Sequence, residues 1–197
     1  GPPRPLSIHP ATDRVAIGIQ PQHRGKSLAF SPDGQWAAVV DNRNNRVLLS
    51  PISGGQPRVL GSFDGVSYVR FDPRGRYVAG TGMYTRRVFI WDVHSSAAVF
   101  EFNGHVSADF SSDGNLLASC SDRGIHIFDT TTWKLVREIP IDNRINIPHR
   151  PIAFQPGSHV VATVGEEQSI ALYEATDGRL KARLIFDDPA DISSLAF

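Results

Sequence analysis

The sequence predicts an all-β protein built from a repeated unit of four short strands. Short apolar segments alternate with turn signals along the 197 residues, which is typical of antiparallel sheets. A phenylalanine that follows small or apolar residues recurs at Phe30, Phe71, Phe110, Phe154 and Phe197, at intervals of 41, 39, 44 and 43 residues. A period of this length with four strands per unit indicates a radial propeller rather than a parallel sheet.

Each repeat contains its strands in a fixed order. The first strand ends at the phenylalanine and leads into a turn, SPDG, DPRG, SSDG or QPGS. Proline pre-sets φ in such turns, and Gly or Asp tolerates the remaining positions. The second strands are WAAVVD, YVAGTG, LLASCS and VVATVG, and the third strands are VLLS, VFIW, IHIF and IALY. The fourth strands pass through RVL (58–60), AVFEF (98–102), LVREI (135–139) and RLKARLIF (179–186).

The repeats predict a single propeller domain or segment with four whole four-stranded blades and partial blades at both ends. The expected boundaries are a partial blade at 5–27, blades at 28–65, 66–106, 107–149 and 150–191, and the first strand of a further blade at 192–197. Two arrangements satisfy this pattern. The chain is a segment of a longer propeller, or it closes as five blades with a fifth blade that lacks its second strand. The segment is favoured, and its open blade edges are expected to associate with other chains.

Composition excludes several classes of partner. Lys+Arg and Asp+Glu are equal at 20 each, so the chain lacks the basic field expected of a nucleic-acid or acidic-membrane binder. No apolar run approaches the roughly 18 residues that a membrane span needs. The single cysteine, Cys120, has no internal disulfide partner, which fits a reducing compartment such as the cytoplasm. We therefore expect a cytoplasmic protein with neither nucleic-acid nor membrane partners.

On these repeats the chain resembles the WD-repeat (WD40) family of β-propellers. The best copies are repeat two, FDPRGRYVAGTGMYTRRVFIWD at 71–92, and repeat three, which begins at Gly104-His105. The resemblance implies a polar network in each blade, made by a His, a Ser or Thr, an Asp and a Trp, and repeat three comes closest to it. His105 lies nearer the anchor phenylalanine than the family spacing. The residues expected to hold the structural frame are Trp91, Asp92, Ser119, Asp122, Phe128, Asp129 and Tyr173.

The resemblance also implies a surface for partners. In WD-repeat relatives the loops between second and third strands, together with the connections between blades, form one face on which peptides dock. Those second-to-third loops correspond here to 41–46, 82–87, 121–124 and 165–169. Tyr and Arg dominate interface hot spots, so the predicted anchor lies in the second of these loops. The predicted contact residues are Met83, Tyr84, Arg86, Arg87, Asn42, Asn44, Arg123 and Glu166.

No motif in the sequence indicates catalysis. The seven histidines form no HxxxH or HxH pair, and GxSxG, P-loop and GxGxxG motifs do not occur. The DNRNN loop at 41–45 lacks the glycine and the distal glutamate of a calcium loop. We therefore predict a non-catalytic scaffold for protein or peptide binding, without metal or cofactor. The alternative is a regulatory or sensor propeller of a larger multidomain enzyme or signalling ATPase. A hydrolase or sugar-binding propeller is less favoured, because third strands end in IWD and IFD.

Overall fold

The computed structural model describes residues 6–7, 16–17, 28–62, 65–82, 85–141, 151–165, 169–185 and 195. Within these residues the structure contains four four-stranded antiparallel sheets and one two-stranded sheet. In each four-stranded sheet the strands are hydrogen-bonded in chain order, so successive strands are neighbours. The prediction of an all-β fold with four whole four-stranded blades is confirmed.

The four sheets are named blades I to IV in chain order. The two-stranded sheet pairs β1 (Leu6–Ser7) with β2 (Ala16–Ile17). Blade I contains β3 (Leu28–Phe30), β4 (Trp36–Asp41), β5 (Arg46–Pro51) and β6 (Arg58–Ser62). Blade II contains β7 (Val66–Phe71), β8 (Tyr77–Gly82), β9 (Arg87–Asp92) and β10 (Ala98–Asn103). Blade III contains β11 (His105–Phe110), β12 (Leu116–Ser121), β13 (Gly124–Asp129) and β14 (Leu135–Pro140). Blade IV contains β15 (Ile152–Phe154), β16 (Val160–Val164), β17 (Ile170–Glu174) and β18 (Leu180–Leu184).

The turn between the first and second strands of each blade is shaped by local side chains. In blade I the Ser31 hydroxyl accepts the backbone N–H of Trp36 at 2.9 Å. In blade II the Asp72 carboxylate takes the same role and accepts the N–H of Tyr77 at 2.6 Å. Gly75 completes the second turn with a φ of 71°, which glycine adopts without steric cost. The SPDG and DPRG signals therefore close turns through different acceptor groups.

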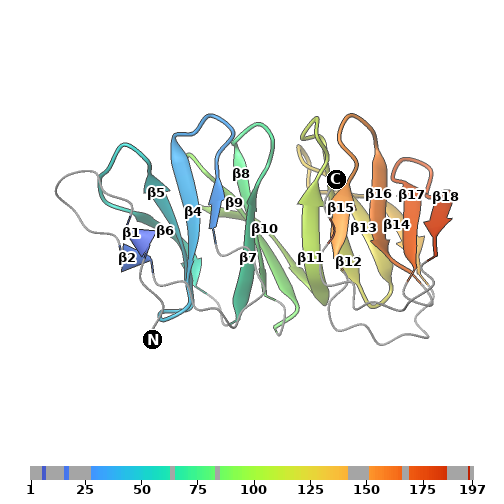
Figure 1. Cartoon of the computed structure of the whole chain (residues 1–197), viewed down its shortest axis with the longest axis horizontal. Coiled ribbons are helices and arrows are strands. Elements are labelled where there is room, and N and C mark those ends of the chain that lie inside the picture. The colour runs from blue at the N-terminus through green and yellow to red at the C-terminus, as the bar shows by residue number, and fades with distance from the viewer. Residues whose placement is uncertain are drawn as a thin grey trace.

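The blades stand side by side in chain order, with blades I and IV at opposite ends of the row (Figure 1). Three apolar clusters join the facing surfaces of neighbouring blades, and each draws residues from both. The cluster between blades I and II contains Val47, Leu49, Val69, Phe71 and Trp91. The cluster between II and III contains Tyr77, Ile90, Phe102, Phe110 and Phe128, and that between III and IV contains Ile127, Ile139, Phe154, Val161 and Tyr173. Blades II and III are consequently packed on both faces.

Asp109 connects the first strands of three blades. Its side chain lies on β11 and is only 5% exposed. The carboxylate pairs with Arg70 on β7 of blade II and accepts the backbone N–H of Phe154 on β15 of blade IV at 2.8 Å. A buried carboxylate is tolerated only with such compensation. The first strands of blades II, III and IV are therefore joined by one acidic residue as well as by apolar packing.

The fourth strands form the outer edge of the blades. Most β14 residues and all β18 residues are exposed, and Leu135, Val136, Leu184 and Ile185 are exposed apolar side chains. An outer strand with free backbone groups is a template for pairing with another chain. Association through open blade edges stays a prediction.

Candidate partner-binding surface

The antiparallel order of the strands sorts the connections to two ends of the blades. Loops between second and third strands, and connections from one blade to the next, lie at one end, here called the loop end. Turns between first and second strands, and between third and fourth strands, lie at the other, here called the turn end. The predicted contact residues Asn42, Asn44, Arg86, Arg87 and Arg123 belong to the loop end. The remaining three, Met83, Tyr84 and Glu166, lie outside the described residues.

Arg86 joins blade II to blade III at the loop end. Its guanidinium forms an ion pair with Asp122 in the β12–β13 loop and contacts the Gly104 carbonyl at 3.3 Å. The Arg86 carbonyl accepts the backbone N–H groups of Gly104, at 2.7 Å, and His105, at 3.1 Å. Arg86 also has a φ of 53°, which is uncommon for a residue with a side chain. These bonds make Arg86 part of the framework that fixes the loops.

The other predicted contact residues differ in how strongly they are held. Arg87 pairs with Glu101 on the neighbouring strand, and its guanidinium lies 4.7 Å from the centre of the Phe89 ring. The Asn44 amide donates to Asp41 at 2.8 Å, and this bond is the largest influence that lowers the pKa of the Asp41 carboxyl. Asn42 and Arg123 are exposed. The loop end thus combines exposed side chains with a rim of loops that the ion pairs of Arg86 and Arg87 hold in place.

The polar network of blade III has a different membership from the one that the family pattern implies. His105 Nδ1 lies 2.8 Å from Ser119 Oγ, and the Ser119 hydroxyl donates to the Ser107 carbonyl at 2.8 Å. Because a serine has a single hydroxyl hydrogen, Nδ1 of His105 is the donor to Ser119. Asp122 lies at the surface in its ion pair with Arg86. His105 therefore joins the network despite its short spacing, and Asp122 instead links two blades.

Burial controls the charge of the histidines in this blade. His105 is 7% exposed, and its ring centre lies 4.8 Å from that of His126. Burial lowers the pKa of His105 to about 4, with His126 and Arg86 adding to the effect. Burial likewise lowers the pKa of His126, although Glu138 opposes the shift. The pair is therefore neutral at physiological pH.

The remaining frame residues lie at the ends of third strands. Trp91 is 1% exposed, Phe128 7% and Tyr173 9%, and each packs between two blades. The Asp92 and Asp129 carboxylates accept backbone N–H groups of the turns that follow, from Ser95 at 2.9 Å and Thr132 at 2.7 Å. The aromatic residue fills the space between blades, while the following aspartate closes the turn to the fourth strand.

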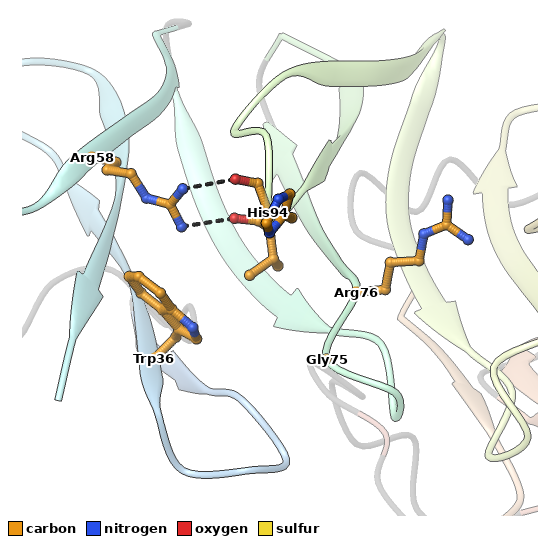
Figure 2. A pocket seen from close by; sticks show the side chains of 6 residues that line it. Trp36, Arg58, Gly75, Arg76 and His94 are labelled. Atoms are coloured by element: carbon orange, nitrogen blue, oxygen red, sulfur yellow. Dashed lines mark hydrogen bonds between the residues drawn. The ribbon is translucent and has the colours of Figure 1, made fainter.

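A pocket that the sequence did not signal lies at the turn end, between blades I and II. It has a volume of about 280 Å³ and is lined by Trp36, Arg58, Gly75, Arg76, Val93 and His94. Figure 2 shows Arg58 reaching from blade I to the backbone of the β9–β10 turn, above the Trp36 ring, while the Arg76 side chain points away. Its residues come from two strands and two turns that are far apart in sequence, so local pattern could not reveal it.

Among the described residues, no group of three or more His, Cys, Asp or Glu side chains is placed to hold a metal ion. The thiol of Cys120 is buried, with its sulfur 3.4 Å from the Thr163 hydroxyl. In the same part of the chain no helix has the length and apolar character needed to cross a bilayer. The expected cytoplasmic location stays a prediction.

Comparison with known families identifies the repeats. The family model described as "WD domain, G-beta repeat" (WD40) matches residues 55–92 and 96–129. Two stretches of the chain are therefore WD40 repeats. Each matched segment begins before the fourth strand of one blade and ends with the third strand of the next, so one sequence repeat bridges two blades. Repeats of this family are consistent with a scaffold for protein interactions.

The curated relatives are much longer than this WD40-repeat chain. Protein HIR2 of Debaryomyces hansenii is 28% identical over 159 residues, which cover 75% of this chain and 15% of that protein. Pre-mRNA-processing factor 19 of Oryza sativa subsp. japonica is 28% identical over 127 residues, which cover 62% and 23%. Its homolog 2 in Arabidopsis thaliana is 29% identical over 128 residues, which cover 63% and 22%. The chain thus spans less than a quarter of each of these relatives.

A solved structure shares the arrangement of the blades. The Kuenenia stuttgartiensis hydrazine synthase superposes with a TM-score of 0.66 at 14% identity, covering 86% of this chain and 51% of that one. At this level of identity the likeness concerns the fold alone.

Proposed function

We propose that this WD40-repeat protein is a non-catalytic scaffold that binds a protein or peptide at its loop end. The observation that carries the proposal is the bonding of Arg86 to both Asp122 and the backbone at Gly104-His105. This bonding joins loops of blades II and III into one surface. Loops that are already rigid lose less conformational entropy when a partner binds, and this favours binding.

The exposed residues at this end suit contact with a polar peptide. Asn42 and Arg123 are exposed at the tips of their loops, and arginine is among the residues that dominate interface energies. The relatives named HIR2 and pre-mRNA-processing factor 19 fit a protein-interaction scaffold. The alternative, a regulatory propeller in a multidomain enzyme, would use the same rim and stays a prediction.

Selection from a displayed peptide library with the full 197-residue chain tests the proposal. Peptides recovered in this way are measured by titration calorimetry against the wild type and against Arg123→Ala. We expect Arg123→Ala to weaken binding about tenfold, the loss of a typical interface arginine.

Arg179→Ala is the matched control, because Arg179 is also an exposed turn residue but lies at the turn end. It is expected to leave the affinity unchanged. Equal affinities for wild type, Arg123→Ala and a joint Asn42→Ala and Tyr84→Ala variant would place binding away from the loop end. Failure to recover any peptide or protein partner would contradict the scaffold function.

A further inference from the structure

We propose that the pocket between blades I and II binds the carboxylate of an acidic side chain from a peptide partner. The proposal rests on the scaffold function and assigns a second contact, at the opposite end of the blades from the loop surface. Four features of the pocket support it: a fixed cation, unused donors, an aromatic wall and a volume suited to one side chain.

Arg58 is the fixed cation. Its Nη1 donates to the His94 carbonyl at 2.9 Å and its Nη2 to the Val93 carbonyl at 2.8 Å. A guanidinium has five N–H donors, so three remain beyond these two bonds. One of the three, Nε, is buried and has no hydrogen-bond partner. An unsatisfied buried donor is costly, so the guanidinium is held in place without being fully bonded within the chain.

The charge of Arg58 is not neutralised within the pocket. Among the described residues no carboxylate forms an ion pair with it. Asp92, which precedes the lining residue Val93, accepts hydrogen bonds from the Ser95 backbone and hydroxyl and lies 3.7 Å from Arg76. The two carbonyl oxygens orient the guanidinium without cancelling a full positive charge. The pocket is therefore electrostatically suited to an anion.

Trp36 fixes the plane of the guanidinium. Its ring centre lies 4.6 Å from the Arg58 guanidinium carbon, a geometry that favours a cation over an aromatic face. With Val93 and Gly75 it provides an apolar wall that would contact the stem of a bound side chain (Figure 2). The volume of about 280 Å³ is below the usual range of about 300–1,000 Å³ for small-molecule pockets. A single glutamate or aspartate side chain fits this description better than a cofactor does.

Arg137 in blade III occupies the position that Arg58 occupies in blade I, and it serves as an internal comparison for this pocket. Arg137 lies opposite Ile127 as Arg58 lies opposite Leu49, and it likewise donates to a turn carbonyl of the next blade, that of Thr176 at 3.2 Å. Both arginines therefore tie neighbouring blades. The position of Trp36 at the start of the second strand is occupied in blade III by Leu116, so Arg137 lacks the aromatic platform. The presence of Trp36 therefore distinguishes the proposed binding site at Arg58 from the purely structural contact made by Arg137.

Arginine-selective NMR on the full chain tests the inference without a known partner. The side-chain Nε–H signals of Arg58 and Arg137 are followed, after ¹⁵N-arginine labelling, during titration with N-acetyl-glutamate amide. We expect a saturable shift of the Arg58 signal, because a charge-assisted bond to carboxylate alters its environment, and no saturable shift of Arg137. The neutral isostere N-acetyl-glutamine amide is expected to shift neither signal.

Variants and a second anion complete the test. Trp36→Leu reproduces the residue found in blade III and is expected to weaken the Arg58 response at least about fivefold. An unsaturable or identical response of Arg58 and Arg137 in the wild type would overturn the proposal, whether or not Trp36→Leu folds. Tighter binding of inorganic phosphate than of the glutamate probe would also overturn it, in favour of a phosphopeptide. If the Arg58 signal does not shift with the glutamate probe although library peptides bind at the loop end, the carboxylate site is refuted while the scaffold function stands.

Discussion

At the scale of single residues, the stability of this WD40-repeat protein depends on a few buried polar groups. Asp109 bonds to residues on both neighbouring blades, and His105 is held neutral by its surroundings. Buried polar groups of this kind are costly to disturb because no water replaces their partners.

Replacement of Asp109 by alanine is expected to lower the free energy of unfolding by about 2–3 kcal/mol, because the buried N–H of Phe154 loses its acceptor. Arg70 is partly exposed, so water solvates its guanidinium in the variant, and the loss of this ion pair adds little to the destabilisation. Urea unfolding followed by tryptophan fluorescence measures the change. Asp177→Ala removes an exposed ion pair with Arg179 and an exposed hydrogen bond from the Arg179 backbone N–H, so it is the control and should cost much less than Asp109→Ala. Equal losses for the two variants would contradict the assigned role of Asp109.

Acid is expected to destabilise the protein through His105. Its pKa is about 4 in the folded chain, below the ordinary value of 6.5, so the unfolded chain binds the proton first. The contribution of His105 to stability is then constant above about pH 7 and falls as the pH drops from 6.5 to 4, by about 3 kcal/mol. Urea unfolding at pH 7 and pH 4.5 measures the fall. The His105→Gln variant should lose part of this pH dependence, and an unchanged profile would refute the assignment.

At the scale of elements, residue sizes are matched across neighbouring blades. Trp91 of blade II packs against Gly61 on β6, where an added Cβ would lie 2.8 Å from the indole Nε1. At the equivalent interfaces Phe128 meets Phe102, with ring centres 4.4 Å apart, and Tyr173 shares a cluster with Ile139. The largest third-strand residue thus faces the smallest fourth-strand residue, which keeps the blades evenly packed.

Gly61→Ala is expected to destabilise the protein by about 1–3 kcal/mol, because overpacking forces the indole or the strand to move. Chemical denaturation measures this loss. In a Trp91→Phe background, which supplies the residue type found in blade III, the same substitution should cost less. This coupling between contacting sites is expected to exceed about 0.5 kcal/mol. Additive effects of Gly61→Ala and Trp91→Phe would show that the clash does not limit packing.

At the scale of the whole molecule, the blades interact mainly with their neighbours in the row. Three separate clusters join them, and each matched sequence repeat bridges two blades. Such architectures behave as sums of unit and interface energies. Phe30, at the first-strand position of blade I, is 55% exposed, whereas its counterparts Phe71, Phe110 and Phe154 are buried. The described packing is therefore strongest in the middle of the row.

Hydrogen exchange is expected to follow this gradient. Amides of β8, β9, β12 and β13, in the blades packed on both faces, should exchange at least about tenfold more slowly than those of β4, β5, β16 and β17. Mass spectrometry of peptic fragments resolves the blades separately. Uniform protection across all four would indicate that they open as a single cooperative unit.

The sequence alone determined the repeat, the strand order and the aromatic frame of this protein. The period of about 40 residues, the turn signals and residues such as Trp91 and Phe128 are local patterns, and local patterns govern strands and hairpins. They predicted the four blades, and the resemblance to the WD-repeat family implied that Asn42, Arg86 and Arg123 lie at one end. The partner and the role of the loop surface depend on experiments.

Tertiary structure decided which residues serve the framework and which remain available for contact. The sequence predicted Arg86 as a partner-contact residue, yet its guanidinium forms an ion pair with Asp122, which lies 36 residues later in the chain. Asp109 and Arg58 carried no sequence signal, because their partners Phe154 and Val93 belong to other blades. Ion pairs and pockets between blades depend on side-chain direction and on the distance between sheets. Those quantities exist only once the blades have packed together.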